Sequence, residues 1–86
     1  MKTFKDLKFT PHKIGVGTHA QMYFDNGYGV SVVCGELFYS NGIDTYEVAI
    51  LHNGYITYST DITSDVLGDQ TADEVSEIMR RVQKLK

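Results

Sequence analysis

The sequence predicts an α+β fold: an antiparallel meander sheet of four to five strands, with one C-terminal amphipathic helix packed on one face. Two Asn-Gly pairs, at 26–27 and 53–54, indicate the sheet, because each is flanked by runs with the alternation of half-buried strands. Apolar residues at helical spacing near the C-terminus indicate the helix. An apolar helix stripe needs a partner surface, so helix and sheet should form a single domain over 1–86.

The first hairpin is expected to join strands at about 18–25 and 28–39. A two-residue loop would place the apolar side chains of the two strands on opposite faces. A three-residue loop at 25–27, with its glycine left-handed, pairs Met22 with Val30 and gathers the apolar side chains on one face. We therefore expect the three-residue loop.

The second hairpin is expected to join strands at about 45–51 and 55–60. The same reasoning favours a three-residue loop at 52–54, which pairs Ile50 with Ile56 and turns both toward the helix.

The helix is expected over about 72–85. Thr71 and Glu74 have the spacing of a capping box, in which the threonine hydroxyl caps the first turn. Its apolar stripe comprises Val75, Ile78, Met79, Val82 and Leu85.

The remaining segments are less regular. Residues 1–14 fit either one helical turn or a strand, which would lie at a sheet edge or end near Thr10 because Pro11 has no backbone donor. Gly35 should bend the second strand before it resumes at 37–39. The polar segment 61–70 reads as a loop with one short turn closed by Gly68.

Composition favours a small soluble protein of the cytoplasm. The chain has 86 residues, a formal net charge of −3 and a single cysteine. One cysteine cannot form an intrachain disulfide, and the charged N-terminus lacks the apolar segment of a signal peptide or membrane span. Nucleic-acid binding needs a face rich in Lys and Arg, so the acidic balance argues against nucleic acid as a direct ligand.

No residue pattern indicates catalysis or a bound cofactor. His12, His19 and His52 lack the spacing of a zinc site. Cys34 falls on the apolar side of its strand, where a small core residue is expected. The carboxylates of the 61–70 segment are also ordinary turn and capping residues. We therefore expect no enzyme, no catalytic residue, no metal and no cofactor.

The sheet face that points away from the helix is the candidate binding surface. It combines tyrosine with small polar and aliphatic residues and carries little charge, as the centres of protein interfaces do. The residues expected to contact a partner are His19, Gln21, Tyr23, Glu47, Leu51 and Tyr55. Exposed edge strands provide a second mode, in which a partner strand or a second copy in a homodimer extends the sheet.

Several segments together resemble small, mostly uncharacterised proteins encoded by tailed bacteriophages. These are TFKDLKF at 3–9, GYGVSV at 27–32, YEVA at 46–49 and ITSDVLG at 62–68. The resemblance covers nearly the whole chain, and its motifs are structural in kind. It implies expression in the cytoplasm of a bacterial host. Small phage accessory proteins of this size often act by binding, for example by blocking a host defence complex such as CRISPR–Cas.

The leading hypothesis is thus a non-enzymatic phage accessory protein that binds a host protein or protein complex and inhibits it by steric occlusion. The alternative is a sponge-like protein that binds a small ligand or nucleotide signal, or a small enzyme acting in a dimer cleft. Its basis is the glycine-rich 15–18 segment beside His12, Lys13 and His19. A third hypothesis is binding of single-stranded nucleic acid by stacking on tyrosines.

Overall fold

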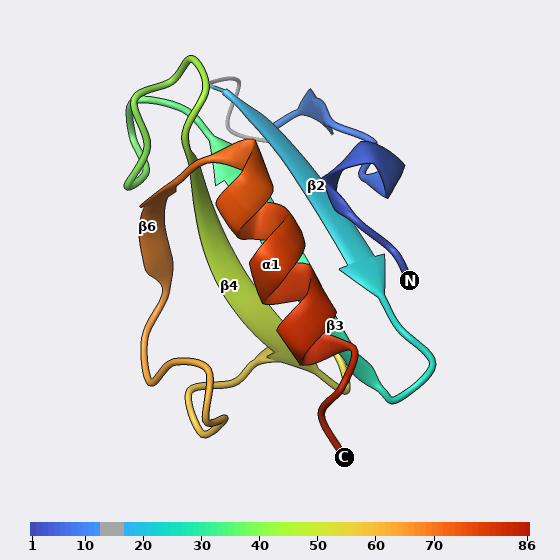
Figure 1. The fold of residues 1–86 in the computed structure, drawn as a ribbon. Helices are drawn as coiled ribbons and strands as arrows, with labels where there is room; N and C mark the ends of the chain where they lie inside the picture. The colour runs from blue at the N-terminus through green and yellow to red at the C-terminus, as the bar shows by residue number, and fades with distance from the viewer. Residues whose placement is uncertain (13–16) are drawn as a thin grey trace.

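The computed structural model describes residues 1–12 and 17–86 (Figure 1). Its elements, in chain order, are η1 (Phe4–Asp6), β1 (Thr10–Pro11), β2 (Thr18–Tyr23), β3 (Tyr28–Cys34), β4 (Tyr46–His52), β5 (Tyr55–Ile56), β6 (Leu67–Gln70) and α1 (Ala72–Val82). The sheet is antiparallel in the order β1-β2-β3-β4-β5, and β6 also pairs with β4. One helix covers one face of this sheet, so the predicted α+β meander is confirmed.

The loop between β2 and β3 is the three-residue loop that the apolar pattern predicts. Met22 lies opposite Val30. The amide of Phe24 donates to the carbonyl of Tyr28 at 2.7 Å, and Gly27 has a φ of +84°. A left-handed residue at this position is the geometry that glycine adopts without a steric penalty.

The loop between β4 and β5 differs from the expectation. Ile56 lies opposite Leu51, not opposite Ile50, so only two residues form the turn. Asn53 and Gly54 both have positive φ, 52° and 92°. That pair of conformations defines a type I′ turn, which Asn-Gly favours. The predicted three-residue loop is therefore wrong, and the side chains of β5 face the opposite way from the expected one.

Three predicted strands are shorter than expected, the one at 18–25 only slightly, since β2 ends at Tyr23. The strand expected at 28–39 ends at Cys34, and residues 35–45 form a loop instead. The strand expected at 55–60 is reduced to Tyr55–Ile56 because β6, which the sequence did not predict, takes the same edge of β4 beside Tyr46 and Val48. The sheet thus has six strands within the described residues.

The N-terminal segment realises both interpretations of its sequence. Phe4–Asp6 form one helical turn, and Thr10–Pro11 pair with β2 as a short edge strand. The amide of Phe4 donates to the Ser76 hydroxyl of α1 at 3.0 Å, so the helical turn is held against the helix.

The helix begins as predicted. The amide of Glu74 donates to the Thr71 hydroxyl at 3.2 Å, and the Thr71 amide donates to the Glu74 carboxylate at 2.9 Å. This capping box satisfies two donors that an uncapped first turn leaves open. The regular helix ends at Val82, three residues before the expected end at residue 85.

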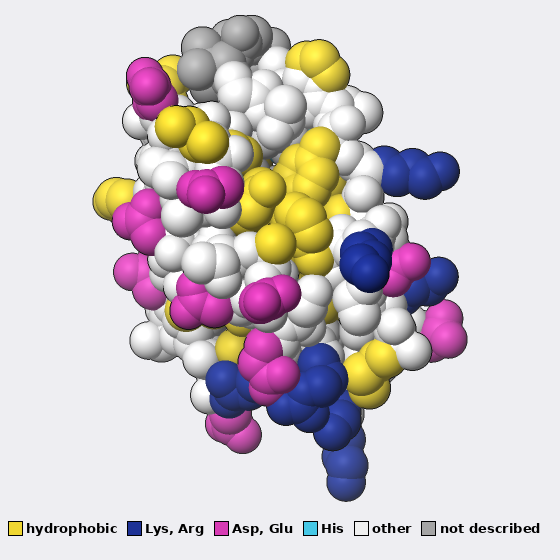
Figure 2. Space-filling model, turned by 45° about the horizontal axis from the view of Figure 1, so that its top comes forward, with side chains coloured by type: hydrophobic (Ala, Val, Ile, Leu, Met, Phe, Trp, Pro, Cys, Tyr) yellow, Lys and Arg dark blue, Asp and Glu magenta, His cyan; other side chains and the backbone are white. Residues whose placement is uncertain are grey.

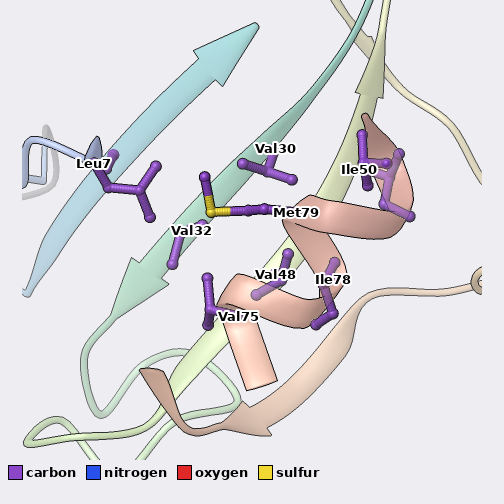
Figure 3. Packing of buried hydrophobic residues seen from close by; sticks show 10 residues of the cluster. Leu7, Val30, Val32, Val48, Ile50, Val75, Ile78 and Met79 are labelled. Atoms are coloured by element: carbon purple, nitrogen blue, oxygen red, sulfur yellow. The ribbon is translucent and has the colours of Figure 1, made fainter. Parts of the chain in front are cut away.

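The core lies between α1 and the helix-facing side of the sheet. Figure 3 shows Met79 reaching from α1 across Val30 and Val32 toward Leu7 of the N-terminal segment. The other buried side chains of this core are Ala20, Val48, Ile50, Val75, Ile78 and Val82. Cys34 is buried, as its strand position predicts. No helix of the described residues is long and apolar enough to cross a membrane.

Candidate functional site

Three of the six predicted contact residues share one face of β2. His19, Gln21 and Tyr23 alternate with Ala20 and Met22, which pack toward the core. They therefore point to the sheet face opposite α1, called the open face below. Gln21 and Tyr23 are exposed, and His19 is half-buried.

The two predicted residues on β4 lie on the open face but are poorly accessible. Leu51 is only 4% exposed. It lies opposite Gly29, and the ring of Tyr23 covers that glycine, because the Tyr23 Cδ1 lies 2.9 Å from where a Cβ on Gly29 would stand. Glu47 is half-buried, and its carboxylate accepts the amide of Tyr39 at 3.2 Å.

Tyr55 is not on the open face. It lies opposite His52, on the side of the sheet that α1 packs against, and is 79% exposed. Because the turn has two residues, Ile56 and not Tyr55 lies on the open face, opposite Leu51. The accessible apolar part of the open face is thus smaller than predicted and consists mainly of Tyr23 and Ile56.

The outer edge of β2 is only partly paired. β1 pairs with Thr18 and His19 alone, so 20–23 have no strand partner on that side among the described residues. This short edge is the one that a second copy or a partner strand could extend.

Three of the large exposed apolar side chains lie on the loop between β3 and β4, outside the open face. In this 35–45 loop, Leu37 is 66%, Tyr39 69% and Ile43 81% exposed. Its ends are close together because β3 and β4 pair up to Val33 and Glu47. A compact surface loop with adjacent ends is an Ω-loop, a class that frequently carries function.

Side chains within the 35–45 loop hold its backbone. The Asn41 Oδ1 accepts three amides, from Ile43 at 2.8 Å and from Asp44 and Thr45 at 3.0 Å. The Ser40 hydroxyl accepts the amides of Gly35 at 2.9 Å and Gly42 at 3.0 Å. These bonds satisfy backbone donors that no strand partner reaches, so the loop has a defined shape.

The 35–45 loop is also tied to the sheet on both sides. The Asp69 amide of β6 donates to the Tyr39 carbonyl at 2.8 Å, and the Thr45 hydroxyl donates to the Asp69 carboxylate at 3.3 Å. On the other side, the Phe38 ring lies over Gly35 and 5.0 Å from the His12 ring.

An open depression of about 410 Å³ lies beside the 35–45 loop, on the helix-facing side. It is lined by Phe9, Gly17, Thr18, Cys34, Gly42, Ile43 and Tyr46. The Tyr46 ring packs 5.0 Å from that of Phe4 and 5.5 Å from that of Phe9. Burial raises the pKa of Tyr46 above its ordinary value, and Cys34 and Asp44 raise it further. The depression thus presents a neutral phenol, and none of its described lining residues is a cation.

The described residues give little support to the small-ligand alternative. Lys13 and the 15–16 part of the glycine-rich segment lie outside the described residues. Gly17 and Thr18 line the depression, whereas His19 points to the open face. There it lies 5.2 Å from His12, measured between ring centroids, and its Nε2 is 3.4 Å from the Thr10 hydroxyl.

No cluster of three or more metal-ligating side chains occurs in the part of the chain that the structure describes. Neither a protein-family model, nor a curated protein, nor a solved structure matches the chain.

Sequence reasoning predicted only a turn after residue 39 in place of the 35–45 loop, because Leu37-Phe38-Tyr39 has the composition of a strand. The turn residues after position 39 also carry a signal against that strand. Ser40-Asn41-Gly42 follows directly, and Ser and Asn side chains offer nearby amides an alternative to strand pairing.

Proposed function

We propose that this chain is a non-enzymatic phage accessory protein that binds a host protein and inhibits it by steric occlusion, with the 35–45 loop as its main contact. One observation carries the binding role: Leu37, Tyr39 and Ile43 are between 66% and 81% exposed on a loop whose backbone is fixed by its own side chains.

A binding role is supported by two properties of the 35–45 loop: its apolar side chains are exposed and its backbone is held in one shape. Large apolar side chains gain free energy when they leave water, about 25 cal/mol per Å² of apolar surface. A partner that covers Leu37, Tyr39 and Ile43 would remove their apolar surface from water, and this burial would favour binding. Because the loop is already held in shape, its association would lose little conformational entropy. Aromatic and aliphatic anchors on a rigid support are the features that dominate protein interfaces.

The identity of the partner class rests on the resemblance to phage-encoded proteins. It places the expected target in the cytoplasm of a bacterial host, and a defence complex of the CRISPR–Cas type is the specific proposal. Occlusion needs no chemistry from the chain, which agrees with a loop of apolar and hydrogen-bonding side chains.

The open face provides a second contact in this proposal. Tyr23 and Gln21 are its accessible members on β2, beside the unpaired edge at 20–23. A partner seated on the loop could extend over this edge, or a second copy could pair there.

The test is affinity capture from host lysate with the full chain and two matched double variants. The first variant, Leu37→Ser with Ile43→Ser, removes apolar surface from the 35–45 loop. The control, Tyr55→Ser with Tyr58→Ser, removes exposed apolar surface from another part of the molecule. Thermal unfolding checks that both variants fold.

We expect the loop variant to lose the proteins that the wild-type chain captures and the control to keep them. If both variants capture the same proteins as the wild type, the loop is not the contact. If the wild-type chain captures no host protein above a scrambled-sequence control, the proposed function itself is contradicted. A third variant, Tyr23→Asp, reports whether the open face contributes.

A further inference from the structure

The charges of this chain are segregated along the sequence. All eight Lys and Arg residues lie within 1–13 and 80–86. Every acidic residue except Asp6 lies within 14–79. The described strands β2 to β6, the loops between them and the first turns of α1 therefore carry negative charge and no Lys or Arg.

The segregation is also spatial. Figure 1 places the 35–45 loop at the end of the molecule opposite the C-terminus, where α1 ends in basic residues. Of the described residues, the upper left of Figure 2 shows acidic and hydrophobic side chains and no Lys or Arg. The molecule is 34 Å long, several times the Debye length of about 8 Å at physiological ionic strength. The basic residues at the end of α1 therefore contribute little to the field around the loop.

The 35–45 loop carries both acidic and exposed apolar side chains. Exposed Glu36 and Asp44 stand beside the exposed apolar side chains Leu37 and Ile43. The carboxylate of Asp69 adjoins the loop through the Thr45 hydroxyl. Burial of these carboxylates against an apolar or acidic surface would be strongly unfavourable, whereas opposite Lys and Arg side chains they would gain charge-assisted hydrogen bonds.

From this juxtaposition we propose that the 35–45 loop docks on a basic protein surface that contains an apolar pocket, with Ile43 and Leu37 in the pocket and Glu36 and Asp44 on its Lys- and Arg-rich rim. The inference rests on the proposed function and adds the chemistry of the partner. Charge complementarity of this kind accelerates association and excludes partners with acidic rims.

The experiment uses two designed amphipathic helical peptides with the same apolar pattern, one of Leu and Lys and one of Leu and Glu. Each is titrated into the isotope-labelled full chain, and amide resonances report where it binds. Two matched pairs of variants follow. Glu36→Lys is compared with Asp61→Lys, which changes the net charge equally away from the loop. Ile43→Ser is compared with Tyr55→Ser, a site of similar exposure.

The Leu/Lys peptide should shift the resonances of 35–45, and the Leu/Glu peptide should not. Glu36→Lys and Ile43→Ser should each raise Kd about tenfold, and the two control variants less than about twofold. The inference is overturned if neither peptide binds, if shifts map to another surface, if both peptides bind alike, or if Asp61→Lys weakens binding as much as Glu36→Lys. Peptide binding at the loop with no capture from host lysate would contradict only the proposed function.

Discussion

Asn26 connects the first hairpin loop to the end of α1. Its Nδ2 donates to the carbonyls of Val82 and Leu85, each at 2.9 Å, and its Oδ1 accepts the amide of Tyr28 at 3.1 Å. The Val82 carbonyl also accepts the Leu85 amide at 3.1 Å, so Asn26 adds a further donor at the point where the helix ends.

Replacing Asn26 should therefore destabilise the protein more than an ordinary loop substitution. Asn26→Ala leaves two part-buried carbonyls without this donor, and we expect a loss of about 1–3 kcal/mol in the free energy of unfolding. The exposed strand position Gln21→Ala should change it by less than about 0.5 kcal/mol. Urea unfolding measures both, and equal effects would show that Asn26 acts only as a turn residue.

At this scale, the sequence predicts what a residue does locally and little of what it does at a distance. The Asn26-Gly27 pair correctly predicts a turn, because backbone preference is local. The helix carbonyls that Asn26 bonds lie 56 and 59 residues away, and no pattern links them to it. The side on which Tyr55 lies depends on one residue of register, so a single wrong loop length misplaced it.

The two hairpins show how identical turn signals give different elements. Both loops read Asn-Gly-Tyr, yet one has three residues and the other two. In the first, the Asn26 side chain is held by the helix end and only Gly27 has positive φ. In the second, Asn53 is exposed and itself adopts a φ of 52°. The short second strand lacks the long apolar alternation that fixes register in the first.

This difference predicts opposite responses to glycine. Asn53→Gly should be nearly neutral, because glycine adopts positive φ freely, whereas Asn53→Ala should cost about 1 kcal/mol. Asn26→Gly should destabilise at least as much as Asn26→Ala, because its side-chain bonds are what matter. Chemical denaturation of the four variants tests this. Equal losses from Asn53→Gly and Asn26→Gly would contradict the assigned turns.

At the scale of the whole molecule, the fold follows from patterns that the sequence displays. Alternating strands, a capped helix and its apolar stripe all point to one helix on one sheet face, and local preferences agree with the global packing. The candidate site does not follow in the same way. Leu37-Phe38-Tyr39 has strand composition, and hydrogen bonds with Ser40, Glu47 and β6 hold this part of the chain in a loop instead.

The charge arrangement was partly visible in the sequence, where the basic residues cluster at both ends. The effect of this arrangement on the 35–45 loop could be seen only from the fold. Only when the 35–45 loop stands at the far end from the basic helix terminus does an acidic, apolar tip appear.

The most direct test of the proposed contact is photo-cross-linking in bacterial host cells, with benzoylphenylalanine placed at Ile43 or, as the matched control, at Tyr55. Both positions are about equally exposed, so they differ mainly in location. A cross-linked host protein at position 43 and none at position 55 is the predicted result. The same host protein cross-linked from position 55 and not from position 43 would contradict the assignment of the 35–45 loop as the binding site.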